Sequence, residues 1–221
     1  LFRGQDPRLS SRNGNYYYVG YVGQALQIFK SKSLVDQGVG KTLPAGMNAT
    51  LFAPVYIDTL GGVTYNAWYV FGSTIWKCAC ADPYDDSDQW AAVVNDLPFT
   101  AGAFDFELFR NPQPGPYQNH WYLLWTASVP GGYAESIYAA EVLSLTPGQK
   151  TLSTYNSDPQ STTNRLITYH QDWTDIITEA PGIAFNGDSV TMAYSGNGAQ
   201  TSLYAVGFAL LKKGQGPTLG S

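Results

Sequence analysis

Short stretches of aromatic and β-branched residues alternate with turns rich in Gly, Pro and Asn along the whole chain. Residues 16–22 (YYYVGYV) and 67–71 (AWYVF) are typical of strands. Asn13-Gly14 and Asn186-Gly187 are hairpin signals, because both residues of such a turn take positive φ easily, and Gly61-Gly62 predicts a further turn. No helical period persists for more than about two turns, and no apolar run approaches the roughly 20 residues of a membrane helix. The pattern predicts an all-β fold.

The strands and turns recur in units of similar length. Units open near Asp6, Pro54 and Asp105, at spacings of 48 and 51 residues, and a longer step that contains a Ser/Thr-rich connection leads to Glu179. Periods of about 40–50 residues with three or four strands each are typical of β-propellers. We therefore predict one propeller domain over residues 1–221, with blades at roughly 1–48, 49–100, 101–165 and 166–211 and a linker or tail at 212–221.

Three carboxylates occupy equivalent places in these units. Asp6, Asp105 and Glu179 each come at or just before the first strand of a blade, and Pro181 marks the start of the strand after Glu179. First strands converge near the axis of a propeller, so we expect the three acids to converge. Taken alone, Glu179 can also be interpreted as an ordinary solvent-exposed glutamate in a loop.

Composition narrows the class of partner. The chain of 221 residues has 13% charged and 14% aromatic residues and a net charge of −5, without a basic cluster. Nucleic acid is an unsuitable partner, because phosphate binding needs concentrated Lys and Arg. Neutral sugars are compatible with this balance, and the abundant Tyr and Trp suit stacking on sugars as well as core packing.

Two cysteines and one sequon complete the candidate chemistry. Cys78 and Cys80 are separated by one residue, so we expect free thiols at alternate positions of one strand. A metal site would need further ligands at suitable spacing, and none is predicted. Asn48-Ala49-Thr50 is a glycosylation sequon that would matter in a secreted eukaryotic protein.

The motifs that open the units resemble those of glycoside hydrolase family 43, a family of five-bladed propeller enzymes. Asp6-Pro7 matches the motif of the first blade, Phe104-Asp105 the motif of the third, and Glu179-Ala180-Pro181 the motif of the fourth. In the second blade the family has Trp-Ala-Pro-Glu, and this chain has Phe52-Ala53-Pro54-Val55. The resemblance spans nearly the whole chain.

The resemblance implies a secreted, inverting glycosidase that releases arabinose or xylose from plant polysaccharides such as arabinan and arabinoxylan. It implies Asp6 as general base, Glu179 as general acid and Asp105 as the residue that modulates the pKa of the acid. In an inverting enzyme the base and the acid stand roughly 6.5–9.5 Å apart to admit water. An α-L-arabinofuranosidase, an arabinanase and a β-xylosidase all fit.

Candidate substrate contacts are Phe52, Trp121 and His170, and His170 also fits a structural role. Trp76, Trp90 and Trp173 are further candidate sugar platforms, although core packing is the better interpretation for at least two of the four tryptophans. We expect no required cofactor. The family sometimes holds a structural calcium, but the sequence offers no ligand set for it.

Two alternatives remain open at this point. The chain also fits a non-catalytic carbohydrate-binding propeller, in which the acids hydrogen-bond sugar hydroxyls. In addition, four blades are visible where the family has five. We therefore expect a second chain or a further segment to complete the propeller, with a ring closed by four blades as the alternative. No membrane partner is expected.

Overall fold

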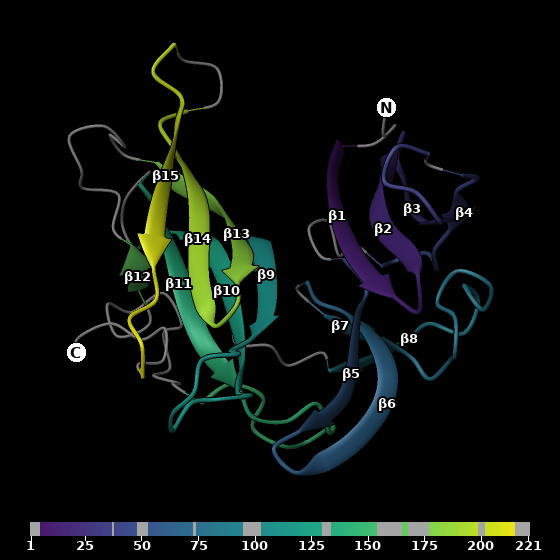
Figure 1. Ribbon diagram of the computed structural model, residues 1–221. Helices are drawn as coiled ribbons and strands as arrows, with labels where there is room; N and C mark the ends of the chain where they lie inside the picture. The colour runs from purple at the N-terminus through teal and green to yellow at the C-terminus, as the bar shows by residue number, and fades with distance from the viewer. Residues whose placement is uncertain are drawn as a thin grey trace. The chain divides into compact units, whose positions relative to one another are not determined.

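The computed structural model describes residues 5–36, 38–47, 53–72, 74–94, 103–129, 134–153, 165–167, 177–198 and 202–214 (Figure 1). Within these ranges all regular secondary structure is β-strand. No helix capable of crossing a membrane occurs in this part of the chain. The all-β prediction is confirmed.

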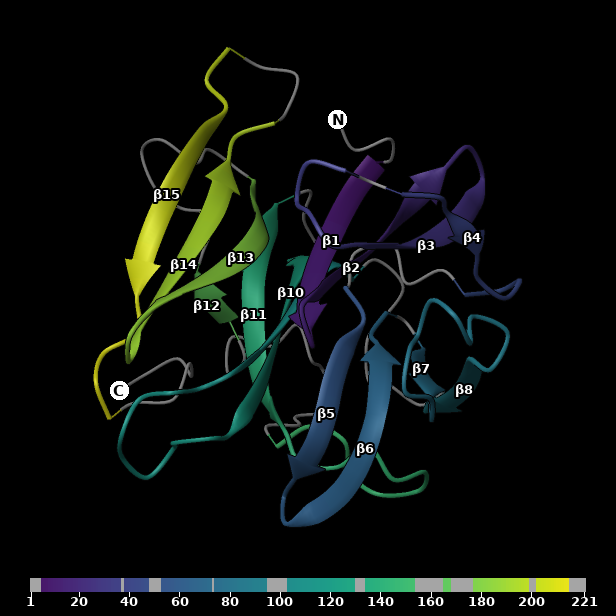
Figure 2. The same cartoon turned by 45° about the vertical axis from the view of Figure 1, so that its right-hand side comes forward.

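The strands form four antiparallel sheets, and in each sheet neighbours in space are neighbours in sequence (Figures 1 and 2). The first sheet contains β1 (Gln5–Arg12), β2 (Asn15–Val22), β3 (Ala25–Ser31) and β4 (Lys41–Thr42). The second contains β5 (Val55–Leu60), β6 (Val63–Val70), β7 (Ile75–Cys78) and β8 (Ala91–Val94).

The third sheet contains β9 (Phe104–Arg110), β10 (Trp121–Ser128), β11 (Glu135–Val142) and β12 (Arg165–Ile167). The fourth has three described strands, β13 (Thr178–Asn186), β14 (Ser189–Gly196) and β15 (Ala205–Leu210). Such consecutive meanders are the blades of a β-propeller, and four of them are present.

The chain divides into two compact units. The first comprises residues 1–97 with 145–149 and holds the first two sheets, and the second comprises residues 98–144 with 150–221 and holds the last two. Each unit is described by itself below. The predicted single catalytic domain and its blade boundaries stay predictions.

Two hairpin turns show why the sequence pattern was informative. Asn13 and Gly14 join β1 to β2 with φ of 51° and 70°, and Gly61 and Gly62 join β5 to β6 with φ of 58° and 79°. These values suit a two-residue turn of the type that matches strand twist. The third predicted turn is displaced by one residue, because Asn186 pairs with Ser189 and leaves Gly187-Asp188 as the loop.

The second unit is held together by apolar side chains between its two sheets. Tyr122, Leu124 and Ile137 of the third sheet form one buried cluster with Val190 and Met192 of the fourth. A cavity of about 230 Å³ lies beside this cluster and is lined by apolar residues, including Leu166 and Leu211 of this unit. Its described lining contains no carboxylate, so it is a packing feature distinct from the acids discussed below.

The opposite face of the fourth sheet is exposed. Val206, Phe208 and Leu210 alternate along β15 and are 58%, 71% and 74% exposed. The strand partners next to Phe208 are small, because Phe208 pairs with Ala193 and Ala193 pairs with Gly182. A Cβ atom added at Gly182 would meet no other atom within 4 Å, so the surface is open there. An exposed apolar stripe of this kind suits coverage by another sheet. That a further chain or segment completes the propeller stays a prediction.

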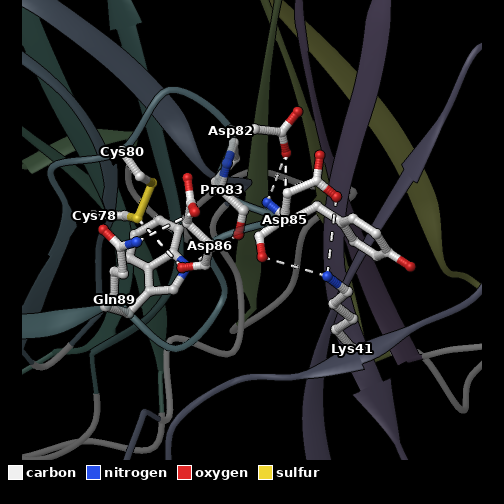
Figure 3. The surroundings of a disulfide bond; sticks show 10 residues. Lys41, Cys78, Cys80, Asp82, Pro83, Asp85, Asp86 and Gln89 are labelled. Atoms are coloured by element: carbon white, nitrogen blue, oxygen red, sulfur yellow. Dashed lines mark hydrogen bonds and ion pairs between the residues drawn. A yellow bond between two sulfur atoms is a disulfide. The ribbon is translucent and has the colours of Figure 1, made fainter.

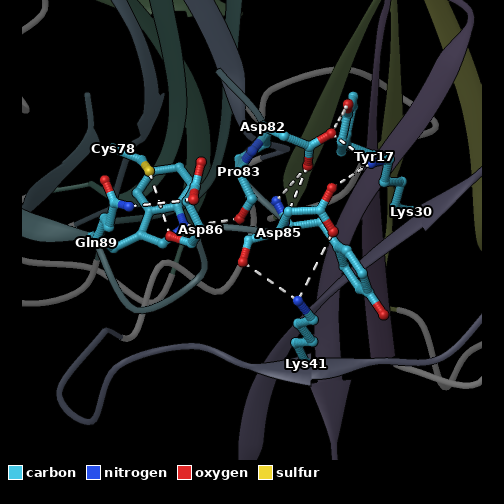
Figure 4. Close-up of polar contacts among 11 residues, drawn as sticks. Tyr17, Lys30, Lys41, Cys78, Asp82, Pro83, Asp85, Asp86 and Gln89 are labelled. Carbon is cyan, nitrogen blue, oxygen red and sulfur yellow. Dashed lines mark hydrogen bonds and ion pairs between the residues drawn. The ribbon is translucent and has the colours of Figure 1, made fainter. Parts of the chain in front are cut away.

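In the first unit, the acidic loop after β7 is folded tightly around Asp82 (Figure 4). Asp82 Oδ1 accepts hydrogen bonds from the N–H groups of Tyr84 and Asp85, at 3.0 and 3.1 Å. Asp82 Oδ2 accepts from Tyr17 Oη at 2.8 Å and lies 2.6 Å from Lys30 Nζ. The loop is thus fixed to strands β2 and β3 of the first sheet.

This arrangement shifts the pKa of each partner. Burial alone would raise the pKa of Asp82, but hydrogen bonds from Lys30, Tyr17 and the loop N–H groups outweigh it and hold the pKa below its usual value. Hydrogen bonds to Asp82 and Asp85 raise the pKa of Lys30. Burial and the bond to Asp82 raise the pKa of Tyr17 to about 12.

The cysteines are a correction to the sequence analysis. Cys78 and Cys80 form a disulfide beside the acidic loop (Figure 3), and the expectation of free thiols is wrong. The expectation failed because β7 ends at Cys78, so the two residues do not occupy alternate positions of one strand. Leaving the strand brings the Cα atoms to 5.2 Å, within the range of roughly 4.4–6.8 Å that a disulfide spans.

Asp82→Asn should lower the free energy of unfolding by about 1–3 kcal/mol near neutral pH, because charge-assisted hydrogen bonds are lost. Since folding lowers the pKa of Asp82, its contribution is present above the unfolded-state pKa of about 3.9 and is lost as pH falls through the folded-state value. Urea denaturation across this pH range measures the difference between wild type and variant. An equal loss with Asp88→Asn, an exposed acid of the same loop, would contradict the central position of Asp82.

Candidate active site

All three predicted acids lie at the same kind of irregularity, a β-bulge in the first strand of a blade. In β1 the pair Asp6-Pro7 stands opposite one residue of β2, and in β9 the pair Asp105-Phe106 stands opposite one residue of β10. In β13 the pair Ala180-Pro181, directly after Glu179, stands opposite one residue of β14. Such bulges redirect side chains and are common beside active sites.

The expected position of Glu179 ahead of its strand is wrong. Glu179 is the second residue of β13 and pairs with Ser195 of β14, and Pro181 lies inside the strand instead of at its start. The bulge explains the difference, because an unpaired bulge position tolerates a residue that has no N–H group. Glu179 is therefore held by strand pairing on one side and by the bulge on the other.

Two bulge residues have backbone conformations that are unusual for their type. Asp105 has a φ of 49° and Ala180 a φ of 53°, both in the left-handed region. This conformation costs a residue with a Cβ roughly 1–2 kcal/mol. Non-glycine residues in it cluster at functional sites, where the surrounding structure must hold them in place.

One backbone N–H group connects the two bulges of the second unit. The Ala180 N–H donates to Asp105 Oδ2 at 3.1 Å and to Thr126 Oγ1 at 3.2 Å. Thr126 is fully buried in β10. The Asp105 carboxylate is thereby fixed to the residue that follows Glu179, and the structure brings these two predicted acids together.

A third carboxyl group joins them that the sequence analysis did not single out. Glu135 is the first residue of β11, opposite Ser128 of β10, and its side chain is hydrogen-bonded to the side chain of Glu179. Burial raises the pKa of Glu135, the charge of Asp105 raises it further, and the hydrogen bond with Glu179 acts in the opposite direction. The available signal was an acid at the start of a largely apolar strand.

The surroundings of Glu135 favour the protonated form of its carboxyl group. Burial removes water from the carboxylate, and the charge of Asp105 repels a second negative charge.

Asp6 belongs to the first unit and lies in β1, and its side chain is outside the described residues. Phe52 and His170 also lie outside the described residues. The predicted roles of these three residues stay predictions.

Among the tryptophans, Trp90 is buried and Trp121 is 8% exposed in β10, so both pack in the core. Too little of the Trp121 ring is exposed for its face to stack on a sugar. Trp76 in β7 is partly buried, and Trp173 lies outside the described residues. Core packing was therefore the correct interpretation for two of the four.

The described part of the chain contains no group of three or more His, Cys, Asp or Glu residues placed to hold a metal ion. His120, the residue before β10, makes a contact of 2.8 Å from Nδ1 to Glu141 Oε1 of β11.

Comparison with solved structures identifies the fold. The structure is similar over 97% of the chain to an alpha-L-arabinofuranosidase from Lactobacillus brevis, of which it covers 69%, with a TM-score of 0.68 and 20% identity. It is similar over 97% of the chain to a thermostable family-43 glycoside hydrolase, of which it covers 70%, with a TM-score of 0.58 and 17% identity.

A third neighbour is an alpha-L-arabinanase from Cellvibrio cellulosa complexed with arabinohexaose. The similarity covers 99% of this chain and 74% of that one, with a TM-score of 0.53 and 15% identity. No family model matches the sequence, and no curated protein matches it. The propeller fold and its likeness to family 43, as predicted from the motifs, are confirmed at the level of structure.

Asp105→Ala should lower the free energy of unfolding by about 1–3 kcal/mol, because the Ala180 N–H loses its charged acceptor and retains Thr126 alone. Asp105→Asn should cost clearly less, since the amide oxygen can still accept the bond. Chemical denaturation of both variants measures the difference. Equal losses in the two variants would show that the hydrogen bond does not hold the bulge.

Proposed function

We propose that the protein is an inverting glycoside hydrolase that releases arabinose or xylose units from plant cell-wall polysaccharides such as arabinan and arabinoxylan. The observation that supports this most directly is the pair of β-bulges that carry Asp105 and follow Glu179, joined by the hydrogen bond from the Ala180 N–H to Asp105 Oδ2. It occurs in a fold shared with an arabinofuranosidase and an arabinanase.

In the proposed mechanism, Glu179 is the general acid. Its O–H bond breaks as a new O–H bond forms on the glycosidic oxygen, which takes the electron pair of the breaking C–O bond. The developing positive charge on the sugar is then met by water on the opposite face. Glu179 suits this role because strand pairing with Ser195 and the bulge that follows fix its position near the start of β13.

Asp6 is the proposed general base, which removes a proton from that water. The support for Asp6 is its place at a bulge of the first strand of a blade, equivalent to the places of Asp105 and Glu179. Asp105 is the proposed modulator of the acid: its carboxylate fixes the backbone at Ala180, the residue after Glu179, and its charge raises the pKa of nearby Glu135.

The proposed substrate contacts are Phe52 and His170, with the sugar as the reacting ligand and no required cofactor; Trp121, also expected from the sequence, is too buried to be proposed as one. The bound arabinohexaose of one structural neighbour supports an oligosaccharide ligand. We further propose an extracellular location. The Cys78–Cys80 disulfide supports it, because disulfides persist mainly in oxidising compartments.

The second candidate function is carbohydrate binding without catalysis. It is favoured by the second-blade motif, where Phe52 and Val55 replace the Trp and Glu of family 43. A binding protein would retain affinity for arabino-oligosaccharides and release no product. Turnover of aryl α-L-arabinofuranosides and aryl β-D-xylosides separates the two functions and tests which sugar is preferred.

Glu179→Gln and Asp6→Asn should each lower kcat by about 10²–10⁴-fold, the usual contribution of one acid or base group. Both substitutions keep the size of the side chain, so thermal unfolding should stay close to that of wild type. The rate is measured by release of nitrophenol from the aryl glycoside that wild type cleaves best.

Asp188→Asn is the matched control for this pair. Asp188 lies in the turn after β13, is exposed, and pairs with Lys213. Its substitution should leave kcat unchanged. Turnover near the wild-type rate in both Glu179→Gln and Asp6→Asn would overturn the proposed mechanism.

A further inference from the structure

An aromatic side chain is held near Glu179 at one end of the fourth sheet. Ser195 of β14 pairs with Glu179 of β13 on one side and with Val206 of β15 on the other. The hydroxyl group of Tyr204, which lies just before β15, donates a hydrogen bond to Ser195 Oγ at 2.6 Å. Paired residues of antiparallel strands have Cα atoms about 4.5–5.5 Å apart and side chains on the same face. The Tyr204 hydroxyl group is therefore held one strand away from the proposed acid.

Asn197 anchors the backbone at Tyr204 to the same strand. It is 7% exposed and has a φ of 67°, the left-handed conformation that asparagine adopts more readily than most residues. Its N–H group donates to the carbonyl of Ile177 at 3.2 Å, and its side-chain amide donates to the carbonyl of Leu203 at 2.8 Å. One buried residue thus joins the chain just before β13 to the residue that precedes Tyr204.

The Tyr204 ring is fixed at both ends and is still open to solvent. Tyr204 is 41% exposed, and Leu203 beside it is 71% exposed. A ring held by its hydroxyl group and by its backbone has little conformational freedom left to lose when a ligand packs on it. Tyrosine combines an apolar face with a polar edge, which suits the C–H surface and the hydroxyl groups of a sugar.

We propose that Tyr204 is a substrate-contacting residue, on which the sugar on the leaving-group side of the scissile bond packs. The proposal rests on the proposed function, because it takes Glu179 as the general acid. The acid gives its proton to the oxygen that leaves with the departing sugar. Groups held next to Glu179 therefore adjoin that sugar, whereas the water attacks from the opposite face of the other one.

The first test compares Tyr204→Ala with Tyr117→Ala. Tyr117 is 40% exposed in the same unit, but it lies in the turn between β9 and β10, at the end of the third sheet opposite to Asp105. Calorimetric titration with arabinotriose and with xylotriose, in the Glu179→Gln background, measures affinity without consuming the ligand. Tyr204→Ala should weaken binding of the preferred trisaccharide about 10-fold. Tyr117→Ala should leave the affinity unchanged, and Tyr204→Phe, which keeps the ring, should retain most of it.

The second test addresses the side of the bond. Cleavage of the trisaccharide expels a sugar, whereas cleavage of the corresponding glycosyl fluoride expels a fluoride ion, which has no ring to pack on tyrosine. Tyr204→Ala should lower kcat/KM for the trisaccharide about 10-fold and leave kcat/KM for the fluoride unchanged. A general disturbance of the fold would lower both.

A third measurement keeps the tyrosine in place. In protein with carbon-13-labelled tyrosine rings, the Tyr204 signal is the one that is absent from Tyr204→Phe. Addition of the trisaccharide to the Glu179→Gln protein should shift this signal and should leave the Tyr117 signal where it is.

The outcomes separate this proposal from the proposed function. A protein that binds the trisaccharide and shifts the Tyr204 signal, but cleaves nothing, removes the catalytic function and leaves the sugar contact standing. Equal affinities of Tyr204→Ala and Tyr117→Ala, or equal losses of kcat/KM on the trisaccharide and the fluoride, overturn the role of Tyr204 and leave an active glycosidase. A protein that neither binds nor cleaves these sugars overturns both.

Discussion

The hydrogen bond from the Ala180 N–H to the Asp105 carboxylate is the contact on which the candidate site depends. It joins the bulge of β9 to the bulge of β13, and it satisfies a backbone donor in a residue with positive φ. Without the extra residue in each strand, regular strand pairing would direct both acids differently. Packing of Val190 and Met192 against the third sheet holds the two strands at the required separation.

The acidic residues of the two units lie in opposite electrostatic environments. In the first unit, Lys30 lies between Asp82 and Asp85, and the pKa of Asp82 is held low. In the second, Glu135 faces other carboxyl groups, and its pKa is raised. The first arrangement stabilises a loop, whereas the second favours the protonated form of Glu135. Environments that move carboxyl pKa values apart in this way are typical of acid–base sites.

The sequence predicted those features that are encoded locally. The turns at Asn13-Gly14 and Gly61-Gly62 follow from residues that tolerate positive φ, and the aromatic strands follow from β propensity. The bulges were not predictable, because Ala180 and Asp105 are not residue types that demand a left-handed conformation. Glu135 was missed for a different reason. It lies 44 positions before Glu179, and their contact depends on how two sheets pack.

The central claim is that this propeller hydrolyses arabinose- or xylose-containing polysaccharides by an inverting mechanism. Proton NMR of the anomeric configuration of the first sugar released from an arabino- or xylo-oligosaccharide is the most direct test. The account predicts that the released sugar first appears in the configuration opposite to that of the bond cleaved, and that mutarotation follows. First appearance of the retained configuration would contradict the mechanism, and binding of the oligosaccharide without release of any sugar would contradict the function.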